Sequence, residues 1–134
     1  MQIIELTGEQ VSLLEDQLEE YDNAHMGQRM DGTISLGIMK DGQLIAGLDA
    51  CMTAYKILYV STVFVDADHR RHGYGKALMI ALEQRARALG ANMIRLDTFD
   101  WQGKAFYEAL GYEIVGSYEN AEDGFSEYFF LKRL

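Results

Sequence analysis

The sequence has no proline and a single cysteine, and each scarcity excludes a class of structure. Proline is common in the linkers that separate domains, so its absence leaves no sign of a boundary. We therefore expect one domain over residues 1–134. Cys51 has no second cysteine with which to form an internal disulfide, which suits a reducing compartment and predicts a cytoplasmic protein.

Long apolar runs are absent as well. No stretch approaches the ~20 consecutive apolar residues that span a bilayer. The segment Met1–Leu6 also lacks the basic start and long apolar core of an export signal. We expect neither membrane anchoring nor export.

Basic residues are few: 12 Lys and Arg stand against 21 Asp and Glu, which gives a formal charge of −9. This balance repels phosphate backbones, so nucleic acid is not expected as a partner, and it attracts small cations or basic peptides. The simpler interpretation, that acidity keeps a small protein in solution, has more weight on composition alone. The densest basic cluster, His69–His72 with Lys76 nearby, stands out against this background.

The first third of the chain predicts a strand, a helix and a loop. Gln2–Leu6 is aliphatic and β-branched, and Thr7–Gln10 matches the capping box that begins a helix. Apolar residues then recur at spacings of three and four, which predicts an amphipathic helix ending near Asn23: Val11, Leu14, Leu18 and Tyr21. His25–Thr33 has no clear period and is expected to be a loop or a short irregular helix.

A hairpin and a β-α-β unit are predicted next. Asp41-Gly42 suits the tight turn of a hairpin, which joins antiparallel strands at Ile34–Met39 and Leu44–Thr53. A strand at Ile57–Val65, a helix from about Gly73 to Leu89 and a strand at Met93–Phe99 follow, so the two strands should be parallel. One apolar stripe marks this helix, and Gly90 suits its end: Tyr74, Ala77, Leu78, Ala81, Leu82 and Leu89.

The end of the chain predicts a shorter helix at Trp101–Leu110 and two closing strands, Tyr112–Val115 and Glu127–Leu131, around an acidic loop at Glu119–Gly124. The element order is mixed α/β and shows no internal repeat. One compact sheet with helices on both faces accommodates all of it.

Basic side chains and two glycines gather in Asp66–Lys76, where a strand leads into a helix. The first turn of a helix has unpaired N–H groups and a partial positive charge, and glycines there let a ligand approach the main chain. The segment therefore predicts a site for an anion such as a pyrophosphate. The alternative is that Gly73 and Gly75 only permit a tight turn and that the basic side chains are solvated.

Two well-known phosphate loops do not match this segment. A P-loop would need glycine where Arg70 stands and a hydroxyl residue where Ala77 stands. The dinucleotide fingerprint would need a small residue in place of Leu78.

What remains, Arg70-x-x-Gly73-x-Gly75, resembles the coenzyme A pyrophosphate signature of the GNAT acetyltransferase superfamily, which also stands between a strand and a long helix. Val63-Phe64-Val65 is similar to the family's strand segment before the signature. Phe106-Tyr107-Glu108-Ala109-Leu110-Gly111-Tyr112 is similar to its later helix, which ends in a Gly-aromatic step. The likeness covers roughly Ile34 to Leu131 in element order.

The resemblance implies a mostly antiparallel central sheet with one parallel, splayed strand pair and helices on both faces. It implies acetyl-CoA as co-substrate and no metal, with the pantetheine arm lying between Ile57–Val65 and Met93–Phe99 like an added strand. The implied cofactor-binding residues are Val63, Phe64, Val65, Arg70, Arg71, His72, Gly73, Tyr74, Gly75 and Lys76.

The resemblance further implies that a primary amine attacks the thioester directly in a ternary complex, with no covalent enzyme intermediate. Tyr107 occupies the place of the family's tyrosine that protonates the leaving thiolate, and it is the implied catalytic residue. The alternative is that Tyr107 packs beside Phe106 as a core aromatic.

This sequence departs from the family pattern near both motifs. Asp100 stands where the family often has asparagine at the start of the later helix, and an Asp can cap a helix but cannot donate. Ala67 replaces a frequent proline, and Arg71 and His72 replace a usual glycine and a variable residue. These changes should alter loop rigidity more than anion binding.

The general base and the acceptor stay open. Asp97, His25, Asp49 and a water chain are all candidates for the base. The acceptor is expected to be a small molecule or a peptide, selected by three segments: His25–Thr33, Tyr55-Lys56 and Glu119–Gly124. Net acidity favours a small cationic amine. An acyl-CoA-binding regulatory module and a small α/β interaction domain are the alternatives, and a homodimer is open for so small a chain.

Overall fold

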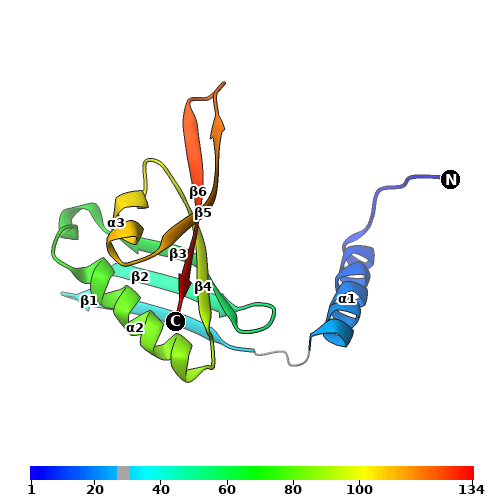
Figure 1. The fold of residues 1–134 in the computed structure, drawn as a ribbon, viewed down its shortest axis with the longest axis horizontal. Helices are drawn as coiled ribbons and strands as arrows, with labels where there is room; N and C mark the ends of the chain where they lie inside the picture. The colour runs from blue at the N-terminus through cyan, green and yellow to red at the C-terminus, as the bar shows by residue number, and fades with distance from the viewer. Residues whose placement is uncertain (27–30) are drawn as a thin grey trace.

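The computed structural model describes residues 1–26 and 31–134 (Figure 1). In chain order the described elements are α1 (Gly8–His25), β1 (Thr33–Lys40), β2 (Gln43–Met52), β3 (Ile57–Val65), the 3-10 turn η1 (Ala67–His69), α2 (Tyr74–Ala88), β4 (Met93–Phe99), α3 (Lys104–Ala109), β5 (Glu113–Asn120) and β6 (Phe125–Arg133). None of these helices combines the length and apolarity needed to cross a membrane.

The strands form one mixed sheet with the order β1-β2-β3-β4-β6-β5. Every pairing is antiparallel except that of β3 with β4, which is parallel. The predicted α/β class and the parallel pair within a mostly antiparallel sheet are therefore confirmed. Strands β1 and β5 are the two edges of the sheet.

The two faces of the sheet differ sharply. One face carries the core, whose strand residues include Leu48, Leu58, Ile94 and Phe130. The side chains that alternate with them point the other way and are exposed along the middle of the sheet: Ser35, Asp49, Thr62, Phe64, Arg95, Asp97 and Phe129. The expected helices on both faces are not found among the described residues, because α1 does not pack on the sheet and leaves this second side uncovered; we call it the open face.

Helix α2 covers the core face across β1, β2 and β3 (Figure 1). Its fully buried residues are Leu78, Met79, Leu82 and Ala86. The predicted stripe was partly wrong, because Ala77 is exposed and Met79 takes its place toward the sheet. Gly90, with φ +91°, ends the helix as predicted.

The amino-terminal segment departs most from prediction. The capping box at Thr7–Gln10 is confirmed, and α1 runs two residues beyond the predicted end at Asn23. No strand forms over Gln2–Leu6, because the described residues offer it no partner strand. Helix α1 stands apart from the sheet and has no buried residue, so its apolar stripe does not join this chain's core (Figure 1). Of the predicted loop His25–Thr33, residues 27–30 lie outside the described part.

Three boundaries near the end of the chain also moved. Helix α3 begins only at Lys104, because the Gln102 side chain accepts a hydrogen bond from the Phe99 N–H at 2.8 Å and holds the preceding residues in a turn. Strands β5 and β6 extend further toward each other than predicted, since pairing continues to Asn120 and Phe125. The acidic loop is thereby reduced to a tight turn that ends at Gly124, with φ +76°.

Candidate functional site

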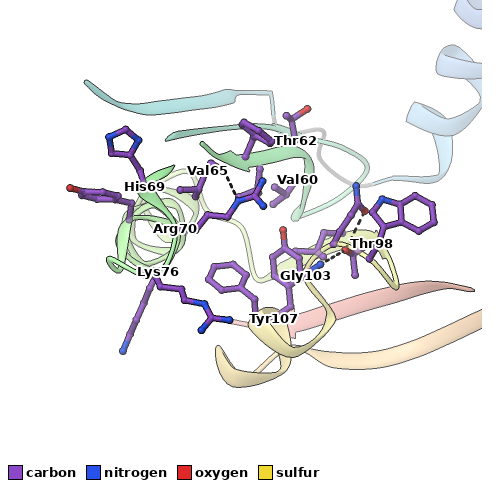
Figure 2. Close-up of a pocket in the computed structure, with 18 of the residues that line it drawn as sticks. Val60, Thr62, Val65, His69, Arg70, Lys76, Thr98, Gly103 and Tyr107 are labelled. Atoms are coloured by element: carbon purple, nitrogen blue, oxygen red, sulfur yellow. Dashed lines mark hydrogen bonds between the residues drawn. The ribbon is translucent and has the colours of Figure 1, made fainter. Parts of the chain in front are cut away.

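A cleft opens where β3 and β4 part. The two strands pair only at Ile57–Tyr59 with Met93–Arg95. Beyond that point β3 is paired with β2 alone, so one edge of its backbone faces the gap. The resulting cleft has a volume of about 950 Å³ and is walled by β3, the η1–α2 loop, β4 and α3 (Figure 2).

The loop before α2 brings its first arginine into this cleft. Arg70 Nε donates to the Val65 carbonyl at 2.9 Å, and its guanidinium lies 5.6 Å from the centre of the Phe64 ring. The side chain is thus held against the end of β3, with its remaining N–H groups available to a ligand (Figure 2).

Two histidines stiffen the same loop. His69 Nδ1 lies 2.9 Å from Asp66 Oδ2, and this hydrogen bond lowers the pKa of the Asp66 carboxyl. His72 Nδ1 lies 2.8 Å from the Arg70 carbonyl and so is turned to the loop's own backbone. Among the residues that the family likeness assigned to the cofactor, His72 alone does not line the cleft.

The start of α2 presents free N–H groups to the cleft, since the first intrahelical bond runs from Ala77 N to the Gly73 carbonyl. Gly73 has φ +82° and would have open space around a Cβ, so its backbone angle requires glycine. Gly75 has a different reason: a Cβ there would lie 3.2 Å from Phe106 Cζ of α3. This glycine therefore allows α2 and α3 to pack closely.

Tyr107 projects from α3 toward the cleft (Figure 2). Its ring is 8% exposed and packs against Phe106, Tyr112 and Phe130. Burial, with a smaller contribution from the negative charge of Asp97, raises the pKa of Tyr107 to about 12. The hydroxyl is protonated at neutral pH and makes no side-chain hydrogen bond within the described chain. The ring packs in the core, as the alternative interpretation expects, and Tyr107 also lines the cleft; its role as proton donor stays a prediction.

The turn before α3 is built from polar groups. Thr98, a buried polar residue, accepts a hydrogen bond from the Gly103 N–H at 3.1 Å. The sequence suggested that Asp100 could cap the later helix, but it does not cap α3. Its carboxylate accepts from the Ser126 N–H at 3.0 Å, because the helix starts four residues later. Asp100 therefore fastens the turn to β6.

Of the three candidate bases, only Asp97 lines the cleft. Its carboxylate accepts a hydrogen bond from Tyr59 Oη at 3.0 Å, and Arg95 lies over the Tyr59 ring at 4.4 Å. Burial and this hydrogen bond raise the pKa of Tyr59. Asp49 lies on the hairpin, where Ser35 donates to it, and His25 lies on α1 with its ring against the Tyr21 carbonyl.

The cleft is bordered by an aromatic cluster, which the sequence motifs did not predict. Trp101 stacks on Phe99 with ring centres 4.7 Å apart, and Phe125 packs against both rings edge-on. Trp101 is 65% exposed and lines the cleft with Gln102. The signal in the sequence was the chain's only tryptophan, placed between a strand and a helix. The proposed acceptor segments Tyr55-Lys56 and Glu119–Gly124 do not line the cleft.

The comparisons with known proteins agree with this fold. The sequence model of the acetyltransferase (GNAT) family matches residues 2–112. The blasticidin-S acetyltransferase of Streptomyces morookaense is 31% identical over 94 residues, which cover 69% of this chain and 68% of that protein.

Two solved structures extend the comparison. The crystal structure of an acetyltransferase from Bacillus cereus is 27% identical and covers 100% of this chain and 98% of its own, with a TM-score of 0.93. An aminoglycoside 6′-N-acetyltransferase complexed with coenzyme A shares the fold at 21% identity, with a TM-score of 0.65 over 88% of this chain and 78% of that one.

The fold is that of the solved acetyltransferase structures to which the chain is similar. The chain belongs to the GNAT family of acetyltransferases, and it is an enzyme of acetyl transfer.

Proposed function

We propose that this chain, acting as one catalytic domain in the cytoplasm, transfers the acetyl group of acetyl-CoA to a primary amine of a small cationic molecule. The observation that carries the proposal is the cleft itself. It runs from a cationic helix terminus at one end to a buried, protonated tyrosine and a carboxylate at the other.

The anionic end of the cofactor fits the start of α2. Arg70 and Arg71 line the cleft there together with the unpaired N–H groups of the first turn of α2, and Lys76 lies in that same turn. Phosphate oxygens satisfy such donors, and the helix dipole adds a favourable field. The set is conspicuous in a chain with a formal charge of −9.

The amide-bearing arm of the cofactor fits the free edge of β3. The backbone of Val63–Val65 has β2 on one side and the cleft on the other. An extended arm hydrogen-bonded to that edge would align along the strand and fix the depth that the thioester reaches. Arg70 limits how far the arm can follow this edge, because Arg70 Nε already donates a hydrogen bond to the Val65 carbonyl.

Acetyl-CoA supplies an activated acetyl group as a thioester. The amine nitrogen forms a bond to the carbonyl carbon, the carbon–sulfur bond breaks, and the thiolate receives a proton while the amine loses one. Tyr107 is positioned to donate to the thiolate, since it is protonated and reaches the cleft. Positive charge that develops on the attacking nitrogen lowers the pKa of Tyr107 and so favours the transfer.

The cleft wall between β4 and α3 favours a cationic acceptor. Asp97 offers a carboxylate, and Trp101 offers an exposed aromatic face. Ammonium groups bind both carboxylates and aromatic faces. The ammonium gives one proton to Asp97 or to a water beside it before attack, and the proton that the nitrogen loses after attack returns to Tyr107, which completes the proton balance. The related proteins are named for blasticidin S and for aminoglycosides, which also supports a small-molecule acceptor.

Calorimetric titration with acetyl-CoA tests the site. The variant R70E/G73D places negative charge at the proposed pyrophosphate position and should lose the micromolar binding of the wild type. A matched control, R85E/G42D, makes the same charge changes at the end of α2 and in the hairpin turn, where Gly42 also has a positive φ. It should bind acetyl-CoA like the wild type.

Absence of binding to wild-type protein by any coenzyme A thioester would overturn the proposal. Thiol release reports turnover. Binding of acetyl-CoA with no thiol release over a broad panel of amines would instead leave a regulatory acyl-CoA-binding module. Thiol release with cationic amines that exceeds release with neutral amines of similar size would support the acceptor class.

A further inference from the structure

Helix α1 is amphipathic, yet every residue of its stripe is exposed. Val11, Leu14, Leu18 and Tyr21 are 43%, 53%, 60% and 64% exposed, although their spacing places them on one side of the helix. Among residues 1–26, moreover, no Lys or Arg is present to form helix-stabilising pairs, and Asp16 and Glu20 repel each other one turn apart. A helix of 18 residues with these features is marginal in water. It needs a surface to bind.

The open face of the sheet offers a complementary surface. Gly37 and Gly47 are paired across β1 and β2, so the sheet has no side chains at that point. Leu44 and Phe64 flank these glycines and are 67% and 60% exposed. Leu44 bends over Gly37, where an added Cβ would lie 2.8 Å from Leu44 Cδ1. Leu44, Gly47 and Phe64 line a largely apolar groove of about 330 Å³, with Asp49 and Thr62 as its polar members, in which a helix can approach the backbone closely.

Helix α1 and the strands that carry the groove, β1, β2 and β3, belong to the same chain but lie apart in it (Figure 1). The crystal structure from Bacillus cereus superposes on this chain over its full length. Residues 1–26 are about a fifth of the chain, so a match of that quality requires the amino-terminal segment to superpose as well. The same displaced position therefore occurs in a related chain in a crystal.

We propose that two copies of this chain exchange their α1 helices, the stripe of each lying in the Leu44–Phe64 groove of the other. The exchange is reciprocal, because each copy contributes one helix and one groove, and it closes as a two-fold dimer. A second copy is the occupant that the displaced helix favours. A helix folded back on its own sheet would have buried its stripe within one chain.

The same exchange accounts for the segment that failed to form its predicted strand. Ile3, Ile4 and Leu6 are exposed and belong to no helix or strand, and β1 is an edge strand with one side unpaired. In the dimer, residues 2–6 follow α1 to the second copy, where the edge of β1 can receive them as an added strand.

The dimer also affects the cleft, and this consequence rests on the proposed function. Thr62 and Phe64 line both the cleft and the groove. A helix in the groove therefore stands beside the β3 wall of the cleft. Its polar side carries only acidic charges apart from His25, which would attract a cationic acceptor.

The test is the molar mass of the full chain by light scattering and by sedimentation at micromolar concentration. The wild type should have twice the mass of a 15.2 kDa chain. L14E/L18E on the helix and L44E in the groove should each shift the mass to that of a monomer. The control S12E/N23E adds the same two charges to the opposite side of α1 and should stay dimeric.

A monomeric wild type, whether α1 is free or folded back, would overturn the exchange. A dimer that survives both L14E/L18E and L44E would also overturn it, because another surface would then hold the copies together. Far-ultraviolet circular dichroism of each variant verifies that the sheet is folded. Acetyl-CoA titration on the same samples separates the two proposals: a monomer that binds acetyl-CoA refutes only the exchange, and a dimer that binds none refutes only the function.

Discussion

The Tyr107 ring is fixed from several sides, which leaves only its hydroxyl for chemistry. Gly103 lies directly against it, since a Cβ there would be 2.9 Å from Tyr107 Cε2. Three further aromatic rings surround it. Replacement of the hydroxyl by hydrogen should therefore alter function without disturbing packing.

Tyr107→Phe should lower kcat about 100-fold or more, the usual contribution of a positioned general acid. The dissociation constant for acetyl-CoA should not change, because the ring stays in place. Steady-state kinetics with a cationic amine, beside calorimetry, measure both quantities. Full activity in the phenylalanine variant would assign Tyr107 to the core alone.

The left-handed backbone at Gly73 and Gly42 allows a matched pair of substitutions. Both glycines have positive φ and open space around a Cβ, so Gly73→Ala and Gly42→Ala should each cost about 1 kcal/mol of stability. Only Gly73→Ala should also weaken acetyl-CoA binding, because only that Cβ faces the proposed phosphates. Urea denaturation and calorimetry measure the two effects. Equal affinity in both variants would leave Gly73 with a structural role.

Sequence patterns could identify individual residues only where local rules apply. Gly73, Arg70 and Tyr107 stand in a linear motif, and the structure places all three around one cleft. The Tyr59–Asp97 hydrogen bond joins residues 38 positions apart, and Trp101 meets Phe125 across a strand and a helix. Such pairs depend on sheet order, which no local pattern supplies.

A partly buried ion pair ties the helices to the sheet. Lys132 of β6 donates to Glu83 of α2 at 2.7 Å and to the Leu110 carbonyl at 2.8 Å. Tyr112 also donates to Glu83, at 3.2 Å. The groups join α2, the end of α3 and β6 at one point. The family motif's Gly-aromatic step thus has a structural role here through Tyr112.

Lys132→Met should destabilise the protein by about 2 kcal/mol, between the values for exposed and buried pairs, because it leaves the largely buried Glu83 carboxylate without its cation. The double variant K132M/E83Q should recover part of this loss, since the amide needs no counter-charge. Chemical denaturation of the wild type, the single variant and the double variant measures the difference. A single variant as stable as the wild type would show that the pair contributes nothing.

Two buried tyrosines near α3 predict a loss of stability in alkali. Burial raises the pKa of Tyr107 to about 12 and that of Tyr112 further. A tyrosine in the unfolded chain ionises near pH 10, so the unfolded state gains stability first as pH rises above 10. The native state should lose about 2 to 3 kcal/mol through Tyr107 between pH 10 and 12.

Thermal denaturation across this pH range tests the expectation. In the Tyr107→Phe variant the decline should be shallower, since that site no longer titrates in the unfolded chain. An unchanged slope would mean that Tyr107 ionises equally in both states.

Element types were predicted better than their placement. The hairpin, the β-α-β unit and the closing strands follow from periodicity and turn residues, which act over a few positions. The apolar stripe on α1 was predicted correctly as a pattern, but its exposure could not be predicted. The surface that we propose for it lies on the sheet of a second copy, and no local pattern specifies such a partner. The strand at Gln2–Leu6 failed for the same reason.

Charge is unevenly distributed over the whole molecule. Residues 1–26 contain acidic side chains and no Lys or Arg, whereas the loop before α2 is basic. Raising the salt concentration from about 0.1 M to about 1 M shortens the Debye length from about 10 Å to about 3 Å. With acetyl-CoA saturating, KM for a cationic amine should therefore rise several-fold, while KM for an uncharged aromatic amine should not. Equal responses would remove electrostatics from acceptor selection.

Because α1 buries no residue on its own chain, the fraction of chains with a bound α1 depends on the concentration of the protein. If α1 binds the groove of a second copy, the groove of a newly synthesised chain stays unoccupied until that chain meets another. Dilution separates the copies and empties both grooves again. Enzyme diluted for an assay would lose activity over time rather than at once, at a rate set by helix release. Abundance would then act as a control on catalysis without any effector molecule.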